Sequence, residues 1–244
     1  MVLGRLLYIG KVKVIFITGD THGDFRRFSS QSFPEGKDLT KQDYVIICGD
    51  FGGIWSTYAK NEENYWLDWL DNKPWTTLFV DGNHENFDRL DVLYQIDKFG
   101  STVGQVRDSL FHLKRGEVYT IDGQKIFTFG GGFSIDKASR MPHVSWWEQE
   151  MPNYAQYANG LDKLAQHDNK VDYVITHTCS LARFNEMALK YDMLHKVADE
   201  EEPLRKYFDV IEEKAEYKKW YCGHFHIKDV FGKVEFLYQK IKIL

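Results

Sequence analysis

The chain of 244 residues contains few cysteines, and their arrangement indicates neither a disulfide framework nor a thiolate metal site. There are three, an odd number, and no two of them form a Cys-x-x-Cys pair. We interpret Cys48, Cys179 and Cys222 as small apolar side chains at the ends of buried strands; the alternative is thiols that bind a metal or are oxidised beside it. Unpaired thiols favour a reducing compartment, so we expect a cytoplasmic protein.

Long apolar runs are also lacking. No run approaches the roughly 18 residues that a membrane helix requires, and we expect no membrane partner. The stretch 6–17 is apolar, but it contains Lys11 and Lys13 and has no small-residue cleavage site, so it predicts a first strand rather than a signal peptide. Without repeats, low-complexity segments or flexible linkers, the sequence fits one domain over residues 1–244.

The chain has no excess of positive charge. Its formal net charge is −5 and its isoelectric point is near 6.0. This balance gives no electrostatic reason to expect nucleic acid as a partner, although a local basic patch is compatible with it. The composition does not indicate an oligomeric state.

Five apolar runs each end in side chains that commonly bind metals. The runs predict buried strands at 12–18, 44–48, 77–80, 171–175 and 220–222. In an open α/β sheet, side chains just beyond the carboxyl ends of neighbouring strands meet in one crevice. The sequence therefore predicts one site built from Gly19-Asp20-Thr21-His22-Gly23, Gly49-Asp50, Gly82-Asn83-His84-Glu85, Thr176-His177-Thr178 and Gly223-His224-Phe225-His226.

The donors in these motifs are carboxylate and amide oxygens and imidazole nitrogens. Such donors fit Mn²⁺, Fe²⁺/Fe³⁺ or Zn²⁺ better than copper(I) or an iron–sulfur cluster. Seven ligands exceed what one tetrahedral ion uses but suit two ions about 3.5–4 Å apart. Asp50 has two oxygens and could bridge the two ions. The predicted metal ligands are Asp20, His22, Asp50, Asn83, His177, His224 and His226.

A histidine outside such a context is more often a satisfied polar residue than a ligand. His177 follows a predicted strand and precedes the double-histidine motif, which favours a ligand. His112 is expected to lie at a strand end, and His167 and His195 are expected to be solvated.

The remaining pattern predicts a two-sheet fold. The residues on both sides of Asp122-Gly123 indicate a β-hairpin, and Gly130-Gly131-Gly132 indicates backbone that passes close to another group. Apolar spacing predicts helices near 58–70, 154–165 and 204–211, and a turn at 231–233. Strands that carry ligands together with separate hairpins predict a four-layer α/β/β/α sandwich of two mixed sheets flanked by helices.

The ordered set of motifs resembles that of the calcineurin-like metallophosphoesterases, over residues 14–226. Small bacterial and phage-type members are also similar around 131–136 and 146–150. The resemblance implies that His84 is a catalytic histidine near the leaving group rather than a ligand. It implies one metal held by Asp20, His22, Asp50 and His226, and a second held by Asp50, Asn83, His177 and His224.

A binuclear centre of this kind predicts hydrolysis of phosphate esters. Two cations reduce charge repulsion at the phosphoryl group and lower the pKa of a bridging water, so that hydroxide is available near neutral pH. His84 would then protonate the leaving group. We expect two divalent ions, Mn²⁺ first and Fe or Zn as alternatives, and a phosphatase or phosphodiesterase acting on mono- or diesters of a small or nucleotide-like substrate.

One departure from the family pattern bears on the substrate. Members that act on phosphoserine and phosphothreonine carry Gly-Asp-x-x-Asp-Arg-Gly, whereas this chain has Gly53 and Ile54 in place of that second Asp and the Arg. Glu85 does match those enzymes. Serine/threonine protein phosphatase is therefore the second interpretation, and a nuclease-type phosphodiesterase or a binding protein with a degenerate site are further alternatives.

The segment 133–152 reads as an insertion over the active site. Arg140 could bind a phosphate, His143 lies in the same loop, and Trp55 could stack on a nucleobase. The alternative is that the tryptophans of this region pack the insertion onto the sandwich and that its charges are solvated.

Overall fold

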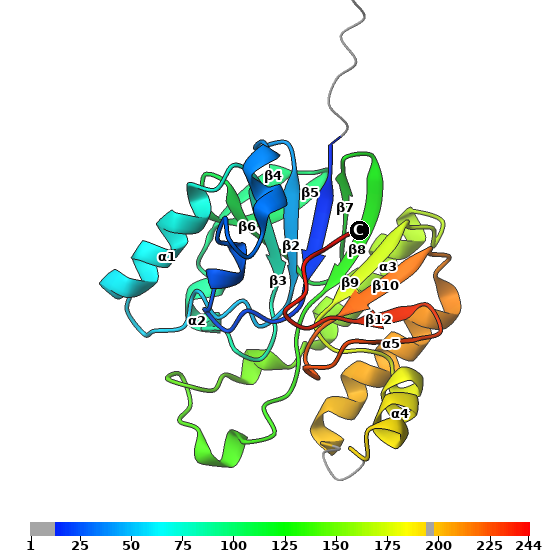
Figure 1. The fold of residues 1–244 in the computed structure, drawn as a ribbon. Helices are drawn as coiled ribbons and strands as arrows, with labels where there is room; N and C mark the ends of the chain where they lie inside the picture. The colour runs from blue at the N-terminus through cyan, green and yellow to red at the C-terminus, as the bar shows by residue number, and fades with distance from the viewer. Residues whose placement is uncertain (1–12, 194–197) are drawn as a thin grey trace, which may run out of the picture.

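The computed structural model describes residues 13–193 and 198–244, and within them two β-sheets pack face to face (Figure 1). The first sheet has seven strands in the order β13-β1-β2-β3-β6-β5-β4. Its members β1, β2, β3 and β6 run parallel, whereas β4, β5 and β13 are antiparallel to their neighbours. The strands are β1 (Ile15–Thr18), β2 (Tyr44–Cys48), β3 (Thr76–Val80), β4 (Tyr94–Lys98), β5 (Ser101–Arg107), β6 (Leu110–Leu113) and β13 (Lys242–Ile243).

The second sheet has six strands in the order β11-β12-β10-β9-β8-β7. Its four central strands are parallel, and β7 and β11 are antiparallel edges. The strands are β7 (Glu117–Ile121), β8 (Gln124–Phe129), β9 (Tyr173–Thr176), β10 (Lys219–Cys222), β11 (Asp229–Phe231) and β12 (Val234–Phe236).

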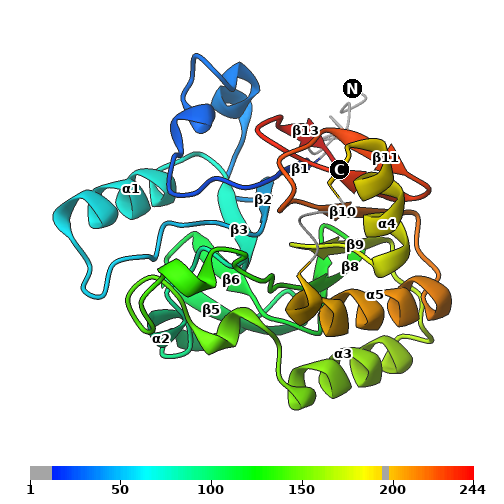
Figure 2. The ribbon, with the colours of Figure 1, turned by 90° about the horizontal axis from the view of Figure 1, so that it is seen from below.

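Helices cover the outer face of each sheet. Seen from below, α1 lies on one side of the sheets and α3 and α5 lie on the other (Figure 2). The α-helices are α1 (Asn61–Asp71), α2 (Phe87–Leu90), α3 (Tyr154–Gln166), α4 (Leu181–Lys190) and α5 (Glu202–Lys214). Short 3-10 helices span Arg26–Phe28, Pro34–Asp38, Lys137–Ser139, Glu148–Glu150 and Asp199–Glu201. The predicted four-layer α/β/β/α sandwich is confirmed. Within the described residues, no helix has the length and apolar character needed to cross a bilayer.

Three apolar layers hold the four structural layers together. Between the sheets, Ile17 and Ile46 belong to the same buried cluster as Ile126 and Ile175 of the second sheet. A second cluster lies under α1 and a third under α3, α4 and α5. Because β1, β2 and β3 are covered on both faces, their sequences are continuous apolar runs. This is why these strands could be predicted.

The hairpin and the helices largely follow the sequence pattern. Asp122 and Gly123 both have positive φ, 48° and 75°, as the predicted two-residue turn requires. The predicted helices correspond to α1, α3 and α5, although Tyr58 lies before α1. The first strand begins at Ile15 rather than residue 12, and residues 6–12 lie outside the described residues, as does His195.

The region between β3 and β7, which the structure describes throughout, contains no long helix. The chain makes only the one-turn helix α2 and then the antiparallel strands β4, β5 and β6. The edge strand β4 is mostly exposed and carries polar side chains at three of five positions. Such a strand lacks the apolar signal of a buried one, because polar residues protect an exposed sheet edge.

Candidate metal centre

The predicted ligands converge where the two sheets meet. The parallel strands β1, β2 and β3 bring the first three motifs to one edge, and β9 and β10 bring the other two to the same edge from the second sheet. Hydrogen bonds join the sheets there. His177 Nδ1 lies 3.0 Å from the Cys48 carbonyl oxygen, and the His224 backbone N–H donates to Asp20 Oδ1 at 3.0 Å.

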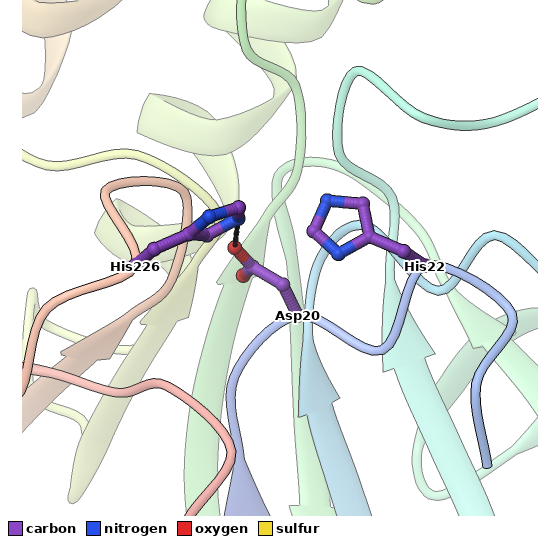
Figure 3. A group of neighbouring side chains, drawn as sticks. All are labelled: Asp20, His22 and His226. Atoms are coloured by element: carbon purple, nitrogen blue, oxygen red, sulfur yellow. Dashed lines mark ion pairs between the residues drawn. The ribbon is translucent and has the colours of Figure 1, made fainter.

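Asp20, His22 and His226 form the first ligand group. Their ligand atoms all lie within 4.8 Å of one another. His226 Nε2 is 3.0 Å from Asp20 Oδ2, and the His22 imidazole lies on the opposite side of that carboxylate (Figure 3). Asp20 is fully buried, whereas the two imidazoles reach solvent.

Asp50, His177, His224 and Asn83 form the second ligand group. His177 Nε2 lies 3.1 Å from His224 Nδ1, 3.2 Å from Asn83 Oδ1 and 3.3 Å from Asp50 Oδ1. The other oxygen of Asp50 lies 3.1 Å from His22 Nε2 in the first ligand group. Each carboxylate oxygen of Asp50 therefore faces a different ligand group.

The electrostatics of this cluster fit divalent cations. Asp20 and Asp50 are buried carboxylates with only 0% and 2% of their surfaces exposed. Burial lowers the pKa of His177, but the charges of Asp50 and Asp20 outweigh that effect and raise it to about 10. The cluster thus favours positive charge. Its donors are oxygens and imidazole nitrogens at mutual distances that a cation between them would satisfy.

The backbone at the ligands is unusual. Positive φ angles occur at His22, Asp50, His224 and His226, at 48°, 46°, 69° and 54°. Residues other than glycine rarely adopt this left-handed region, and when they do they are concentrated at functional sites. Four of the seven predicted ligands share a strained conformation that the sequence pattern did not reveal.

The match to known families agrees with this geometry. A family model for calcineurin-like phosphoesterases matches residues 13–228. The chain belongs to the calcineurin-like phosphoesterase family. No curated protein gave a significant match. Members of the family are metal-dependent hydrolases of phosphate esters, and this protein is a phosphoesterase of that general class.

The cysteines of this phosphoesterase belong to its buried apolar clusters. Cys48, Cys179 and Cys222 are free and fully buried. Burial raises the pKa of Cys48 and Cys222 well above the ordinary value, which keeps both thiols protonated. Among the described residues, none of the three belongs to a ligand group. Cys48 and Cys222 end β2 and β10, as expected, whereas Cys179 lies three residues beyond the end of β9.

A buried carboxylate that the sequence analysis missed lies behind His224. Glu201, at the end of the 3-10 helix Asp199–Glu201, is fully buried, and its Oε1 lies 3.4 Å from His224 Nε2. Its other oxygen accepts a hydrogen bond from Arg205, whose guanidinium lies 3.6 Å from the centre of the Phe184 ring. Because Nε2 faces Glu201, Nδ1 of His224 is left to face His177. Glu201 is therefore placed to orient this predicted ligand, as carboxylates commonly do behind metal-binding histidines.

Glu201→Gln is expected to weaken metal binding by about 10–100-fold. The carboxylate charge of Glu201 orients His224 and raises the basicity of its imidazole, and the substitution removes that charge. Titration calorimetry with Mn²⁺ measures the effect on the metal-free protein. Glu200→Gln is the matched control, since Glu200 is exposed and one residue away. Equal Mn²⁺ affinities for the two variants would show that Glu201 is merely structural.

Asn83 is oriented from the other side of the second ligand group. Its Nδ2 donates to Ser134 Oγ at 3.3 Å, and the Ser134 backbone N–H donates to Glu150 Oε2 at 3.1 Å. The amide oxygen of Asn83 is thereby directed toward His177. The glycine run permits this approach, because a Cβ at Gly132 would lie 2.9 Å from the His177 ring.

His84 lies at the mouth of the cluster, and its backbone N–H donates to Asp50 Oδ1 at 2.8 Å. Its ring lies 4.9 Å from the ring of His22 and is stacked on Trp55 at 5.6 Å between centroids. Burial is the main cause that lowers its pKa to about 4; Asp50 opposes the shift, whereas His22 and Arg140 reinforce it. The imidazole of His84 is therefore neutral in this arrangement.

The insertion 133–152 brings one of its predicted substrate residues to the cluster. Arg140 Nη2 lies 3.3 Å from His84 Nε2. His143 instead lies 3.0 Å from Asp88 Oδ2 on α2, and Trp147, which is fully buried, donates to the same oxygen at 2.9 Å. His143 and Trp147 thus anchor the insertion, whereas Arg140 reaches toward the ligands. Figure 1 shows the insertion as the green loop below the sheets.

Proposed function

We propose that this protein is a binuclear metal-dependent phosphoesterase that hydrolyses phosphate mono- or diesters of a small or nucleotide-like substrate. The observation that carries the proposal is Asp50, whose two oxygens face separate ligand groups, with His84 bonded to the same carboxylate through its backbone. We place this chemistry in a single domain with an insertion at 133–152, and the three free thiols favour a cytoplasmic setting.

The two ligand groups would each hold one divalent ion, Mn²⁺ being the first choice for their oxygen and nitrogen donors. Such ions, when bound, offset the negative charge of the phosphoryl group and make a water acidic enough to supply the nucleophile near neutral pH. Asp50 would connect the two ions. Asp20, His22 and His226 would hold one of them, and Asn83, His177 and His224 would hold the other.

His84 would act on the leaving group. It belongs to a motif that follows β3, and Trp55 packs against one face of its ring and so restricts its orientation. A substrate phosphate brings negative charge next to the ring, which counteracts the effects that lower its pKa. His84 could then give its proton to the departing oxygen.

The structure also supports a small substrate over a phosphoprotein. Ile54, at the position of the phosphate-binding Arg of protein phosphatases, is 2% exposed and packs in the core under α1. A Cβ at Gly53 would lie 2.5 Å from the Phe51 ring, so an Asp does not fit there. A cation beside His84 comes instead from the insertion, because Arg140 Nη2 lies 3.3 Å from His84 Nε2.

The purified protein is expected to hydrolyse bis-p-nitrophenyl phosphate and at least one nucleotide-type ester when loaded with Mn²⁺, with little activity on a phosphoserine peptide. Initial rates on the three substrates, before and after treatment with a chelator, provide the measurement. Efficient dephosphorylation of the peptide would favour the protein phosphatase alternative. Absence of hydrolysis with Mn²⁺, Fe²⁺ and Zn²⁺ alike would contradict the proposed function.

A further inference from the structure

Arg140 is held by two contacts within the insertion, and the third nitrogen of its guanidinium faces His84. Nε lies 2.7 Å from Asp136 Oδ1, and Nη1 donates to the Ser145 carbonyl oxygen at 3.2 Å. The remaining nitrogen, Nη2, lies 3.3 Å from His84 Nε2. The side chain is only 11% exposed. Within the insertion, Arg140 is therefore a pre-positioned cation rather than a solvated one.

The chemistry of a guanidinium limits what Arg140 can do there. It keeps its charge at any relevant pH, and all its nitrogens donate hydrogen bonds. It therefore cannot act as an acid or a base, but it can bind an oxyanion, with best geometry when two oxygens are presented together. Ions held by the two ligand groups would already offset the negative charge of the attacked phosphoryl group. The additional cation lies beside His84, the residue that acts on the leaving group in the proposed function.

Resting on that proposed function, we propose that the preferred substrates are phosphoanhydrides, in which the leaving group is itself a phosphate that Arg140 binds. Dinucleoside polyphosphates and nucleoside diphosphate derivatives have this chemistry. An alkyl or aryl leaving group offers no phosphate oxygens to the guanidinium, so Arg140 would stabilise its departure less. Arg140 is thus a residue that determines specificity for the leaving group.

The reaction balances without a further reactant. Water adds to one phosphorus, and the bond from that phosphorus to the bridging oxygen breaks. The electron pair remains on the leaving phosphate, whose charge Arg140 neutralises, and the protons of water pass to solvent. The leaving phosphate needs no proton at neutral pH, so this departure depends less on His84 than the departure of an alkoxide does.

Two probes with the same attacked phosphorus test the inference. In diadenosine 5′,5‴-diphosphate the leaving group is adenosine 5′-phosphate, whereas in the p-nitrophenyl ester of adenosine 5′-phosphate it is nitrophenolate. Arg140→Ala is expected to lower kcat/KM by about 10²-fold on the anhydride, the usual effect of removing one positioned donor, and by less than about 10-fold on the nitrophenyl ester. Lys137→Ala is the matched control, because this cation of the same loop lies 4.1 Å from the Trp146 ring centre.

Each outcome separates the two proposals. Equal losses on both probes would show that Arg140 binds the attacked phosphoryl group, and no loss would remove it from the site; either result overturns the anhydride preference. Hydrolysis of bis-p-nitrophenyl phosphate by the wild type in those cases leaves the proposed function intact. Thermal unfolding and Mn²⁺ binding report whether Arg140→Ala is folded, and Arg140→Gln, which can still bond Asp136, replaces it if it is not.

Discussion

Asp50→Asn is expected to reduce bound Mn²⁺ from about two equivalents to well below one. It should also lower kcat/KM by more than about 10–100-fold, the loss typical when a residue that only contacts a metal ligand is replaced. The reason is geometric, because the two oxygens of Asp50 face different ligand groups. Asn keeps an oxygen for the His84 backbone N–H but loses the charge that two cations would share. Metal analysis after dialysis, together with steady-state kinetics, provides the measurement.

Two further variants sharpen this test. His22→Ala is expected to release mainly one ion, since His22 belongs to the first ligand group. Asp24→Asn is the matched control, because this carboxylate is half exposed and pairs with Arg26 rather than with the ligand groups. A stoichiometry fixed at one under saturating Mn²⁺ in the wild-type protein would refute the bridging role of Asp50.

His84→Asn is expected to lower kcat by about 10²–10⁴-fold while both ions are retained. The loss should be largest for alkyl esters, whose leaving groups need a proton, and smallest for nitrophenyl esters. Kinetics on such a series, with metal analysis of the same preparation, checks both parts of the prediction.

The metal content of His84→Asn decides whether His84 is a ligand or a proton donor. His84 Nε2 or Nδ1 also lies within 4.8 Å of ligand atoms of His22 and Asp50, so the geometry alone is compatible with a ligand. If His84→Asn lost an ion together with activity, His84 would be a ligand and not a proton donor.

The strand ends could be predicted because burial on both faces leaves a continuous apolar run, and the polar residue that interrupts it marks the edge of the sheet. The residues that contact the predicted ligands from the protein side could not be predicted. Glu201 lies in the acidic run Asp199-Glu200-Glu201-Glu202, and nothing in the sequence distinguishes it from its exposed neighbours. Its role depends on the approach of β10 and α5, which only tertiary packing establishes.

His112 shows the same limit. The sequence analysis expected it at a strand end, and it does lie near the end of β6, but it is buried and its Nε2 lies 2.9 Å from Asp81 Oδ1. Arg115 donates to the other oxygen of Asp81 at 2.8 Å. The sequence indicated a strand end at His112 but not which charged residues pair with it, and this buried network was therefore not predicted.

The pairing of the first strand with the last one affects the order of folding steps. β1 lies between β2 and β13, and Phe16 pairs with Ile243. The hydrogen bond between Asp20 and the His224 backbone spans 204 residues. Closing such long loops is slow because their conformational entropy is lost before the contacts form. During synthesis, the cluster cannot assemble until residue 226 has left the ribosome, so we expect metal uptake to coincide with a late step of folding.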